Sequence, residues 1–380
     1  MRRKVLGVDT EPTLAACRRL ISALPALAAT WSLLTTALGL WWWARPDAYP
    51  FAPGNADPSG TLLAVVPDAA VAPALVAAGA WGLVVAGPAR RHPGLVVGTG
   101  AGFAVLFGLA VPGLQPLSLT GYLMAMFGPI VLAGTLVAGA WRRRGGATAV
   151  GVLVLIGAAA WFSGVADGAV LARYTGFISA ALQKIGPPGA LLFLLAGGLL
   201  WGVLAARTAV AQRACRPAPA WTRPESAARW GRVAAVIAAI CALPYGLQRL
   251  TWLTPWPFAV SAGELAANPD MRLHGLLLGL SSLAGAVLTL GLISRWGEVW
   301  PRWMPALRGR PVPLAAAVVP GALVAALFTA AAFPMMLLWI DKGEPWAVLV
   351  FPFPVWGPAL GAAVLGYALR RGAGSATVQT

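Results

Sequence analysis

Four side chains at the end of a long apolar stretch are the first candidates for chemistry in this sequence. Tyr245, Gln248, Arg249 and Trp252 lie in "YGLQRLTW" at helical spacing, so they share one face of a helix. Such a face fits two roles. An aromatic and cationic group anchors a helix at a membrane boundary, whereas an arginine and an amide inside a helix bundle line a polar cavity. The neutral amide favours the cavity, because an anchor gains little from it.

An arginine inside a helix bundle needs partners for its planar guanidinium, and carboxylates at the same level are the expected partners. Asp167 is expected about one turn inside the fifth apolar stretch, where an acid is a functional candidate. Asp270 is expected to cap the helix that it begins. His274 is either a neutral side chain packed between helices or a group that binds a ligand or transfers a proton. The resulting candidate site, the polar outer cluster, consists of Tyr245, Gln248, Arg249, His274, Asp167, Glu264 and Asp270.

The chain around these residues is too apolar for a water-soluble protein. Hydrophobic residues make up 59% of its 380 residues and charged residues only 11%, against roughly 25% charged in soluble domains. Apolar stretches of about 20 residues recur, each long enough to cross a bilayer. The sequence therefore predicts an all-α, polytopic transmembrane helical bundle, with residues 1–380 in one integral membrane domain.

About ten transmembrane helices are predicted from these apolar stretches. A short amphipathic helix over residues 172–185 is expected to lie in the membrane interface. The ten predicted spans cover residues 18–43, 69–88, 93–112, 117–141, 148–170, 187–208, 229–253, 272–294, 312–339 and 346–369.

Basic residues lie mainly on one side of the predicted membrane. With both termini on that side, its loops and termini hold 22 of the 28 Lys and Arg residues. By the positive-inside rule this side is cytoplasmic, which predicts a cell-membrane protein with both termini in the cytoplasm. The formal net charge of +16 then follows from topology and from contact with anionic lipids at the cytoplasmic face. No nucleic-acid partner is expected.

Short matches in the same order favour an internal repeat between the first four and the last four spans. "ALP" occurs at residues 23 and 242, and "FGPIVLAGTLVAGAWRRRGG" in span 4 corresponds to "WGPALGAAVLGYALRRGAG" in span 10. Both halves run in the same direction, so an axis along the membrane normal would relate them. The predicted halves are residues 16–141 and 227–371, with an inserted helix pair at 148–210.

Motifs for a phosphate-binding loop, a zinc protease or a CxxC site are absent from the sequence. The only two histidines, His92 and His274, fall on opposite sides of the predicted membrane, so neither a metal site nor a cofactor is predicted. The loop at 295–311, "RWGEVWPRWMPALRGRP", interleaves tryptophans with arginines. This pattern is typical of an interfacial segment, and a docking surface for a partner is the alternative.

Two stretches, "ALPYGLQRLTW" and "RWGEVWPRWMPALRGRPVP", resemble a pattern found in uncharacterised multi-pass membrane proteins of high-GC Gram-positive bacteria. The resemblance covers mainly spans 7 to 9. It implies a protein of the bacterial plasma membrane, and it implies no activity and no catalytic residue.

Three functional classes remain open from the sequence. A small-molecule transporter is favoured by the number of spans, the repeat, the many Gly and Pro residues within helices, and the polar outer cluster. A membrane-embedded enzyme acting on a lipid or lipid-linked substrate at the outer face is the main alternative, resting on the outer carboxylates and His274. An accessory or structural membrane subunit is the third class.

Overall fold

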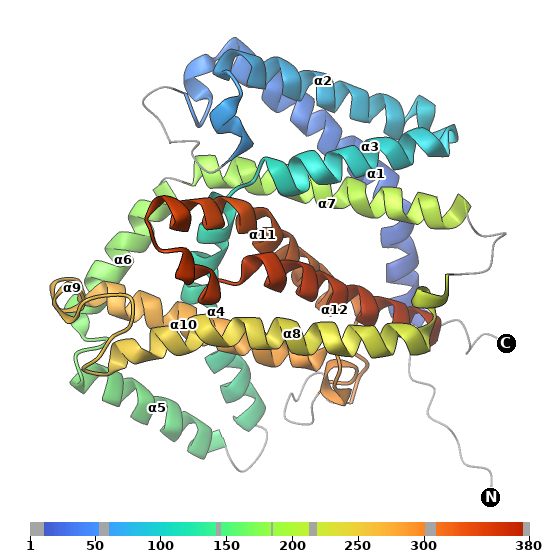
Figure 1. The fold of residues 1–380 in the computed structure, drawn as a ribbon. Coiled ribbons are helices and arrows are strands. Elements are labelled where there is room, and N and C mark those ends of the chain that lie inside the picture. The colour runs from blue at the N-terminus through green and yellow to red at the C-terminus, as the bar shows by residue number, and fades with distance from the viewer. Residues whose placement is uncertain are drawn as a thin grey trace, which may run out of the picture. The chain divides into compact units, whose positions relative to one another are not determined.

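The computed structural model describes residues 11–52, 61–141, 146–183, 185–212, 219–300 and 309–374. Within these residues the regular structure is helical, as Figure 1 shows, and strand pairing is limited to one isolated bridge between Val299 and Pro311. The predicted all-α fold class is confirmed.

Eight of the described helical segments are long and apolar enough to cross a membrane. Each of them overlaps one of the ten predicted spans, and the multi-pass membrane character predicted from composition is therefore supported by the helices themselves. The eight segments are Ala23–Ala44, Asp68–Ala86, Pro93–Ala110, Gly186–Gln212, Pro224–Leu253, Pro269–Gly291, Leu314–Asp341 and Pro345–Gly372.

The fourth and fifth predicted spans correspond to α4 (Gln115–Trp141) and α5 (Gly146–Phe162). The predicted end of the fifth span at residue 170 is wrong, because the helix stops at Phe162 and the chain turns through Gly164 with a φ of 70°. A left-handed backbone of this kind suits glycine and ends a helix. The predicted interfacial helix then begins earlier than residue 172, as α6 (Gly168–Gln183).

The chain divides into two compact units. Unit 1 contains α1 (Glu11–Ala44), α2 (Asp68–Ala86), α3 (Pro93–Val105) with the first part of its π-helical extension Leu106–Ala110, and the later part of α7 (Gly186–Gln212). Its core is aromatic: the Trp31 and Trp201 rings each meet the Phe103 ring edge to face. The Trp201 indole donates to the buried Ser32 hydroxyl at 3.3 Å. Any side chain at Gly197 would overlap the Trp31 ring, so glycine is required there.

Unit 2 contains most of the other helices. Small residues line its central helix, α8, so that the neighbouring helices approach closely, as is common between membrane helices. Gly231 of α8 faces Gly366 of α12, and Gly246 of α8 lies against Leu283 of α10. The helices of unit 2 are α4, α5, α6, α8 (Pro224–Leu250), α9 (Ala262–Ala267), α10 (Pro269–Gly291), α11 (Leu314–Asp341) and α12 (Phe353–Gly374).

Helix α8 packs against both α10 and α12, α11 packs against α12, and α4 and α6 pack against α10. Helices α8 and α12 lie side by side and antiparallel, as Figure 1 shows. Gly231 near the start of α8 lies beside Gly366 near the end of α12, while the Tyr245 ring meets the Phe351 ring 5.1 Å away at the other end. The pair therefore has two distinct ends, named here the Arg249 end and the Arg371 end.

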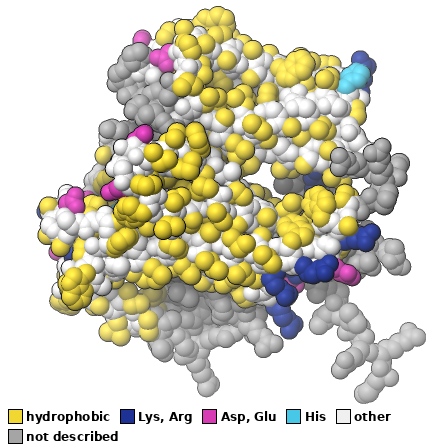
Figure 2. Space-filling view, viewed as in Figure 1, with side chains coloured by type: hydrophobic (Ala, Val, Ile, Leu, Met, Phe, Trp, Pro, Cys, Tyr) yellow, Lys and Arg dark blue, Asp and Glu magenta, His cyan; other side chains and the backbone are white. Residues whose placement is uncertain are grey.

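Apolar side chains cover the visible face of this helix pair, and Lys and Arg side chains gather where α8 begins and α12 ends, as Figure 2 shows. Such a distribution is expected of helices whose middle portions face lipid and whose ends face water.

The predicted repeat stays a prediction. The helix pairs that it would relate, α1 with α2 and α8 with α10, are both packed pairs with glycine at the contact. Gly79 of α2 lies against Thr36 of α1, and Gly279 of α10 lies against Arg249 of α8. The boundary between the two compact units follows Gly108, inside the predicted first half.

Candidate functional site

Arg249 lies in the last turn of α8 and packs against α10. A Cβ atom at Gly279 would come within 2.5 Å of the Arg249 Cβ, so the glycine leaves the space that the arginine stem occupies. The guanidinium carbon lies 4.1 Å from the centre of the Trp252 ring and 5.0 Å from that of the Tyr245 ring. Arg249 is therefore held against protein by two aromatic rings, an arrangement that stabilises a cation.

The ion pair predicted for Arg249 is absent. Among the described residues the one salt bridge joins Arg370 to Glu298, at the other end of the helix pair. The Nε atom of Arg249 is buried without a hydrogen-bond partner, and the guanidinium interacts with the hydroxyl of Tyr245. The positive charge of Arg249 is thus supported by aromatic rings and a phenol and is not neutralised by a carboxylate.

The three acids predicted as partners of Arg249 lie at the starts of helices instead. The Asp167 carboxylate accepts a hydrogen bond of 2.9 Å from the Val170 N–H and caps α6, so it lies in the turn after α5 and not inside a span. Ser261 and Glu264 form a capping box on α9. Hydrogen bonds from the Ser261 backbone and hydroxyl hold the pKa of the exposed Glu264 carboxyl below its usual value. The cap predicted for Asp270 is wrong, because the side chain makes no cap hydrogen bond in the first turn of α10.

Gln248 fastens the loop that follows α8. Its side-chain amide donates to the Phe258 carbonyl at 2.9 Å, and the Trp252 indole donates to the same carbonyl at 3.2 Å. The Phe258 N–H in turn donates to the Thr251 hydroxyl at 2.9 Å. Gln248 is only 8% exposed, and its side-chain oxygen is buried with no hydrogen-bond partner. The Gln248 amide nitrogen therefore holds the loop, while the amide oxygen is an acceptor without a donor.

His274 sits in an aromatic enclosure made by α4 and α6. Its ring centre lies 4.9 Å from that of Tyr122, 5.3 Å from Phe177 and 5.9 Å from Tyr174. Both ring nitrogens are buried without a partner, and so is the hydroxyl of Tyr174. Burial raises the pKa of Tyr174, so the phenol is a hydrogen-bond donor at neutral pH.

The structure brings Tyr245, Gln248, Arg249 and His274 together at one end of unit 2. Arg249 is near enough to His274 to act on it electrostatically, and the Tyr122 ring lies edge to face against the His274 ring. Four helices, α4, α6, α8 and α10, contribute to this group. We call it the Arg249 cluster, and its members are Tyr122, Tyr174, Phe177, Tyr245, Gln248, Arg249, Trp252 and His274.

Sequence reasoning missed Tyr122, Tyr174 and Phe177 as parts of the site. A signal was available, because the chain has only five tyrosines and three of them lie in this cluster. Tyrosine combines an apolar ring with a hydroxyl, so its repeated use inside a bundle points to a mixed polar and aromatic surface. In the part of the chain that the structure describes, no group of His, Cys, Asp and Glu side chains could hold a metal ion.

The Arg371 end carries a second polar group, which we call the Arg371 clasp and which consists of Glu298, Tyr367, Arg370 and Arg371. Arg370 forms the ion pair with Glu298 and donates to the Leu292 carbonyl at 2.9 Å. Arg371 donates to the Tyr367 hydroxyl at 2.8 Å and to the Val312 carbonyl at 3.1 Å.

The clasp changes the interpretation of the loop at 295–311. The Tyr367 hydroxyl donates to the Gly297 carbonyl at 2.8 Å, so the described start of this loop folds back onto α12. The sequence predicted an interfacial segment, and residues 301–308 of it lie outside the described residues. The described part is held by the clasp, through bonds that satisfy its polar groups.

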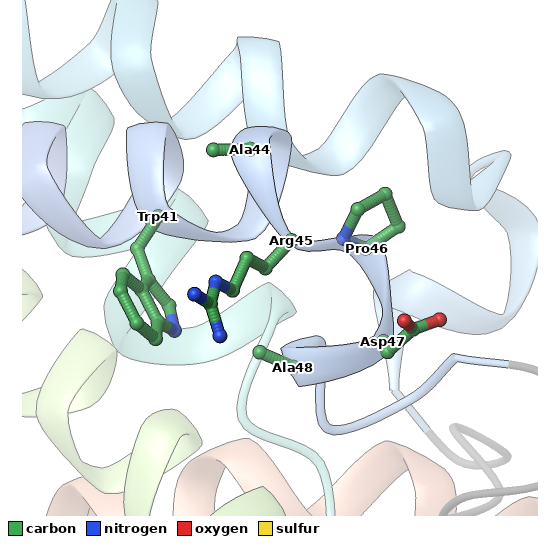
Figure 3. Close-up of a pocket in the computed structure, with 6 residues that line it drawn as sticks. All are labelled: Trp41, Ala44, Arg45, Pro46, Asp47 and Ala48. Atoms are coloured by element: carbon green, nitrogen blue, oxygen red, sulfur yellow. The ribbon is translucent and has the colours of Figure 1, made fainter.

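A shallow recess of about 460 Å³ in unit 1 is lined by Trp41 and by residues 44–48, which Figure 3 draws as sticks. The Arg45 guanidinium lies 5.2 Å from the centre of the Trp41 ring, while the Asp47 carboxylate points away from both. One exposed turn supplies the whole lining, without polar groups converging from other helices. An arginine beside tryptophan in this setting is typical of an interfacial anchor.

The Arg249 cluster is therefore the strongest candidate site, because it alone among these three groups gathers unpartnered buried polar atoms from several helices. No family model matches this chain, and neither a curated protein nor a solved structure shows significant similarity to it.

Proposed function

We propose that this chain is a transport protein of the bacterial plasma membrane, and that its substrate passes through the Arg249 cluster. One observation carries the proposal: His274, Tyr174, Gln248 and Arg249 keep buried polar atoms without partners between apolar helices. Leaving such an atom unpaired costs about 1–3 kcal/mol. Groups of this kind inside a membrane domain are typically used to bind what crosses it.

The positions of the acids favour transport over the enzymatic alternative. An enzyme acting on a lipid-linked substrate at the outer face needs a carboxylate or a similar group free to transfer a proton. Of the three acids, Asp167 is engaged in capping α6 and Glu264 in capping α9, which leaves Asp270 in the first turn of α10. The Arg249 cluster itself contains no carboxylate, so it is better suited to binding than to acid–base catalysis.

A purely structural subunit is less well supported. A structural role is served by polar groups that satisfy one another, as they do in the Arg371 clasp. In the same unit, the Arg249 cluster keeps buried polar atoms that have no partner. Unsatisfied groups add no stability, so a ligand that completes them is the simpler explanation.

Prolines inside the helices of unit 2 provide points at which these helices bend. Pro244 lies inside α8, one turn before Gln248, and Pro334 lies inside the later part of α11. A proline within a helix removes one backbone hydrogen bond and kinks it. Interrupted helices next to a polar site are a common feature of transporters.

The proposal places the Arg249 end outside and the Arg371 end in the cytoplasm, as the distribution of basic residues predicts. Cysteine labelling of intact cells tests this orientation. We expect a membrane-impermeant maleimide to react with Trp256→Cys, in the loop after α8, and not with Ala220→Cys, before α8. The opposite pattern would refute the orientation.

Flux through proteoliposomes tests transport itself. Vesicles containing the purified protein are filled with a mixture of bacterial metabolites, diluted, and assayed by mass spectrometry for solutes that escape. We expect at least one solute to leave faster than from empty vesicles, and Arg249→Met to abolish the difference. Arg45→Met is the matched control and should transport normally, because Arg45 also lies beside a tryptophan but belongs to an exposed turn.

Transport is contradicted if no solute leaves the protein-containing vesicles faster than the empty ones, with protein that is correctly folded and inserted. It is also contradicted if Arg249→Met and Arg45→Met have the same effect on every solute that leaves.

A further inference from the structure

We infer that the Arg249 cluster binds a small organic carboxylate whose body is apolar or aromatic. This inference rests on the proposed function for its biological meaning, and it concerns the chemical class of the substrate. Three features of the cluster carry it: the sign of its charge, the availability of a donor, and the nature of its walls.

The charge of the cluster is positive. Arg249 is its only permanently charged member, and none of the eight residues is an acid. Asp270, on the first turn of α10, acts electrostatically on His274 but forms no ion pair with Arg249. A cation held in an apolar bundle without a counter-ion attracts an anionic ligand, because the low dielectric strengthens the attraction.

Arg249 has a donor available for an anion, because its Nε–H is buried without a hydrogen-bond partner. The Trp252 and Tyr245 rings lie against the guanidinium, at 4.1 and 5.0 Å from its carbon. A contact with an aromatic ring uses none of the hydrogen-bonding capacity of the guanidinium N–H groups. A carboxylate is planar and accepts two such hydrogen bonds side by side, which a single ammonium group cannot match.

The aromatic side chains around His274 suit a ligand with an apolar body and few polar substituents. Tyr122 and Phe177 lie edge to face against the His274 ring, with their ring centres 4.9 and 5.3 Å away. His274 offers one donor and one acceptor, and Tyr174 offers a hydroxyl, none of which has a partner among the described residues. Apolar walls with a few well-placed polar atoms are the usual composition of a small-molecule site.

Binding is measured on the purified full chain by thermal unfolding. Cys241 is buried in α8, so a thiol-reactive fluorophore reports unfolding once Cys17 and Cys215 are replaced by serine. The protein is placed in nanodiscs of neutral lipid and titrated with phenylacetate, with 4-hydroxyphenylacetate, and with phenylacetamide, the neutral analogue of the first. Aliphatic monocarboxylates of similar size extend the series.

We expect at least one carboxylate to raise the unfolding temperature in a saturable manner, at concentrations where the matched amide has no effect. Arg249→Met should abolish this shift, and Arg249→Lys should weaken binding by roughly 10- to 100-fold, because a lysine loses the paired hydrogen bonds. Arg45→Met should bind as the wild type does. His274→Phe should weaken binding of 4-hydroxyphenylacetate more than binding of phenylacetate, because it removes the ring nitrogens and keeps an aromatic ring.

The inference is overturned if amide and carboxylate act alike, if Arg249→Met keeps the shift, or if anionic phospholipid alone stabilises the protein. These results separate it from the proposed function. If a carboxylate binds in an Arg249-dependent manner and no solute leaves the proteoliposomes, the result supports the inference and refutes transport. If a neutral or cationic solute leaves the vesicles and Arg249→Met does not stop it, the result supports transport and refutes carboxylate binding.

Discussion

The arginines at the two ends of the α8–α12 pair differ in their hydrogen-bond and charge partners. At the Arg371 end, Arg370 and Arg371 contact Glu298, the Tyr367 hydroxyl and the carbonyls of Leu292 and Val312. At the Arg249 end, the guanidinium contacts two aromatic rings and no carboxylate. The same helices thus carry one arginine group that is satisfied within the protein and one that is not.

The unit that contains Arg249 also contains the three acids that the sequence suggested as its partners. Asp167, Glu264 and Asp270 belong to the same unit, and two of them are engaged in helix caps. None of these three acids forms a salt bridge with Arg249 like that of Glu298 with Arg370. The comparison indicates that the clasp contributes stability, whereas the Arg249 cluster leaves buried polar atoms without partners at some cost in stability.

The sharpest test places the same substitution at both ends. We expect Arg371→Met to lower the free energy of unfolding by about 2–3 kcal/mol, because it removes charge-assisted hydrogen bonds to Tyr367 and Val312. Arg249→Met should lower it by less than about 1 kcal/mol, since no ion pair is broken and the new side chain is apolar. Thermal unfolding followed at Cys241 measures both, and equal losses would break the comparison.

A second prediction concerns the hydroxyl at the centre of the clasp. Tyr367→Phe should lower the free energy of unfolding by about 1–2 kcal/mol, because the hydroxyl both donates to Gly297 and accepts from Arg371. Tyr174→Phe is the matched change at the other end and should have almost no effect, since the Tyr174 hydroxyl has no partner. If the two variants unfold alike, the distinction between satisfied and unsatisfied ends is wrong.

The ion pair of the clasp should contribute less than its hydrogen bonds. The Arg370 and Glu298 side chains are 29% and 35% exposed, so water weakens their attraction. Glu298→Gln should therefore lower the free energy of unfolding by about 0.5–1 kcal/mol, and 1 M salt should reduce this loss. Wild-type and variant unfolding curves at low and high salt measure it, and a loss that grows with salt would argue against the pair.

The smallest effect is expected in the loop beyond the Arg249 end. The Glu264 carboxyl has a lowered pKa through its hydrogen bonds with Ser261, so its contribution to the order of α9 is present above its usual pKa. This contribution is lost as the pH falls through the lowered value. Protease susceptibility of the loop should rise over that range in the wild type and be independent of pH in Glu264→Gln. A wild-type profile as flat as that of the variant would show that the capping box does not order the loop.

Much of the fold follows from the sequence, because it depends on local properties. The length and apolarity of each stretch predict membrane helices, and eight described helices meet that expectation. The shared helical face of Tyr245, Gln248 and Arg249 is likewise a matter of spacing. The end of the fifth span was mispredicted because Ala, Val and Gly after Phe162 remain apolar, and hydropathy alone does not register a turn at Gly164.

The candidate site was only partly predictable. Gln248 and Arg249 were recognised as unusual, yet Gln248 binds a backbone carbonyl ten residues later and Arg249 lacks the expected carboxylate. The Arg371 clasp was not foreseen at all, since Arg370 and Glu298 lie 72 residues apart in the chain. Tyr122 of α4 also belongs to the site, and no pattern in the sequence indicated this residue.

By itself the sequence determined that this is an all-α membrane protein and which helix face carries Arg249. Hydropathy and helical periodicity decide such properties, because each acts over neighbouring residues. Only the tertiary structure decided which arginine is paired and which is not, and which aromatic rings surround His274. Those contacts join helices that are distant in the chain, and their geometry depends on how closely glycines such as Gly279 let the helices approach.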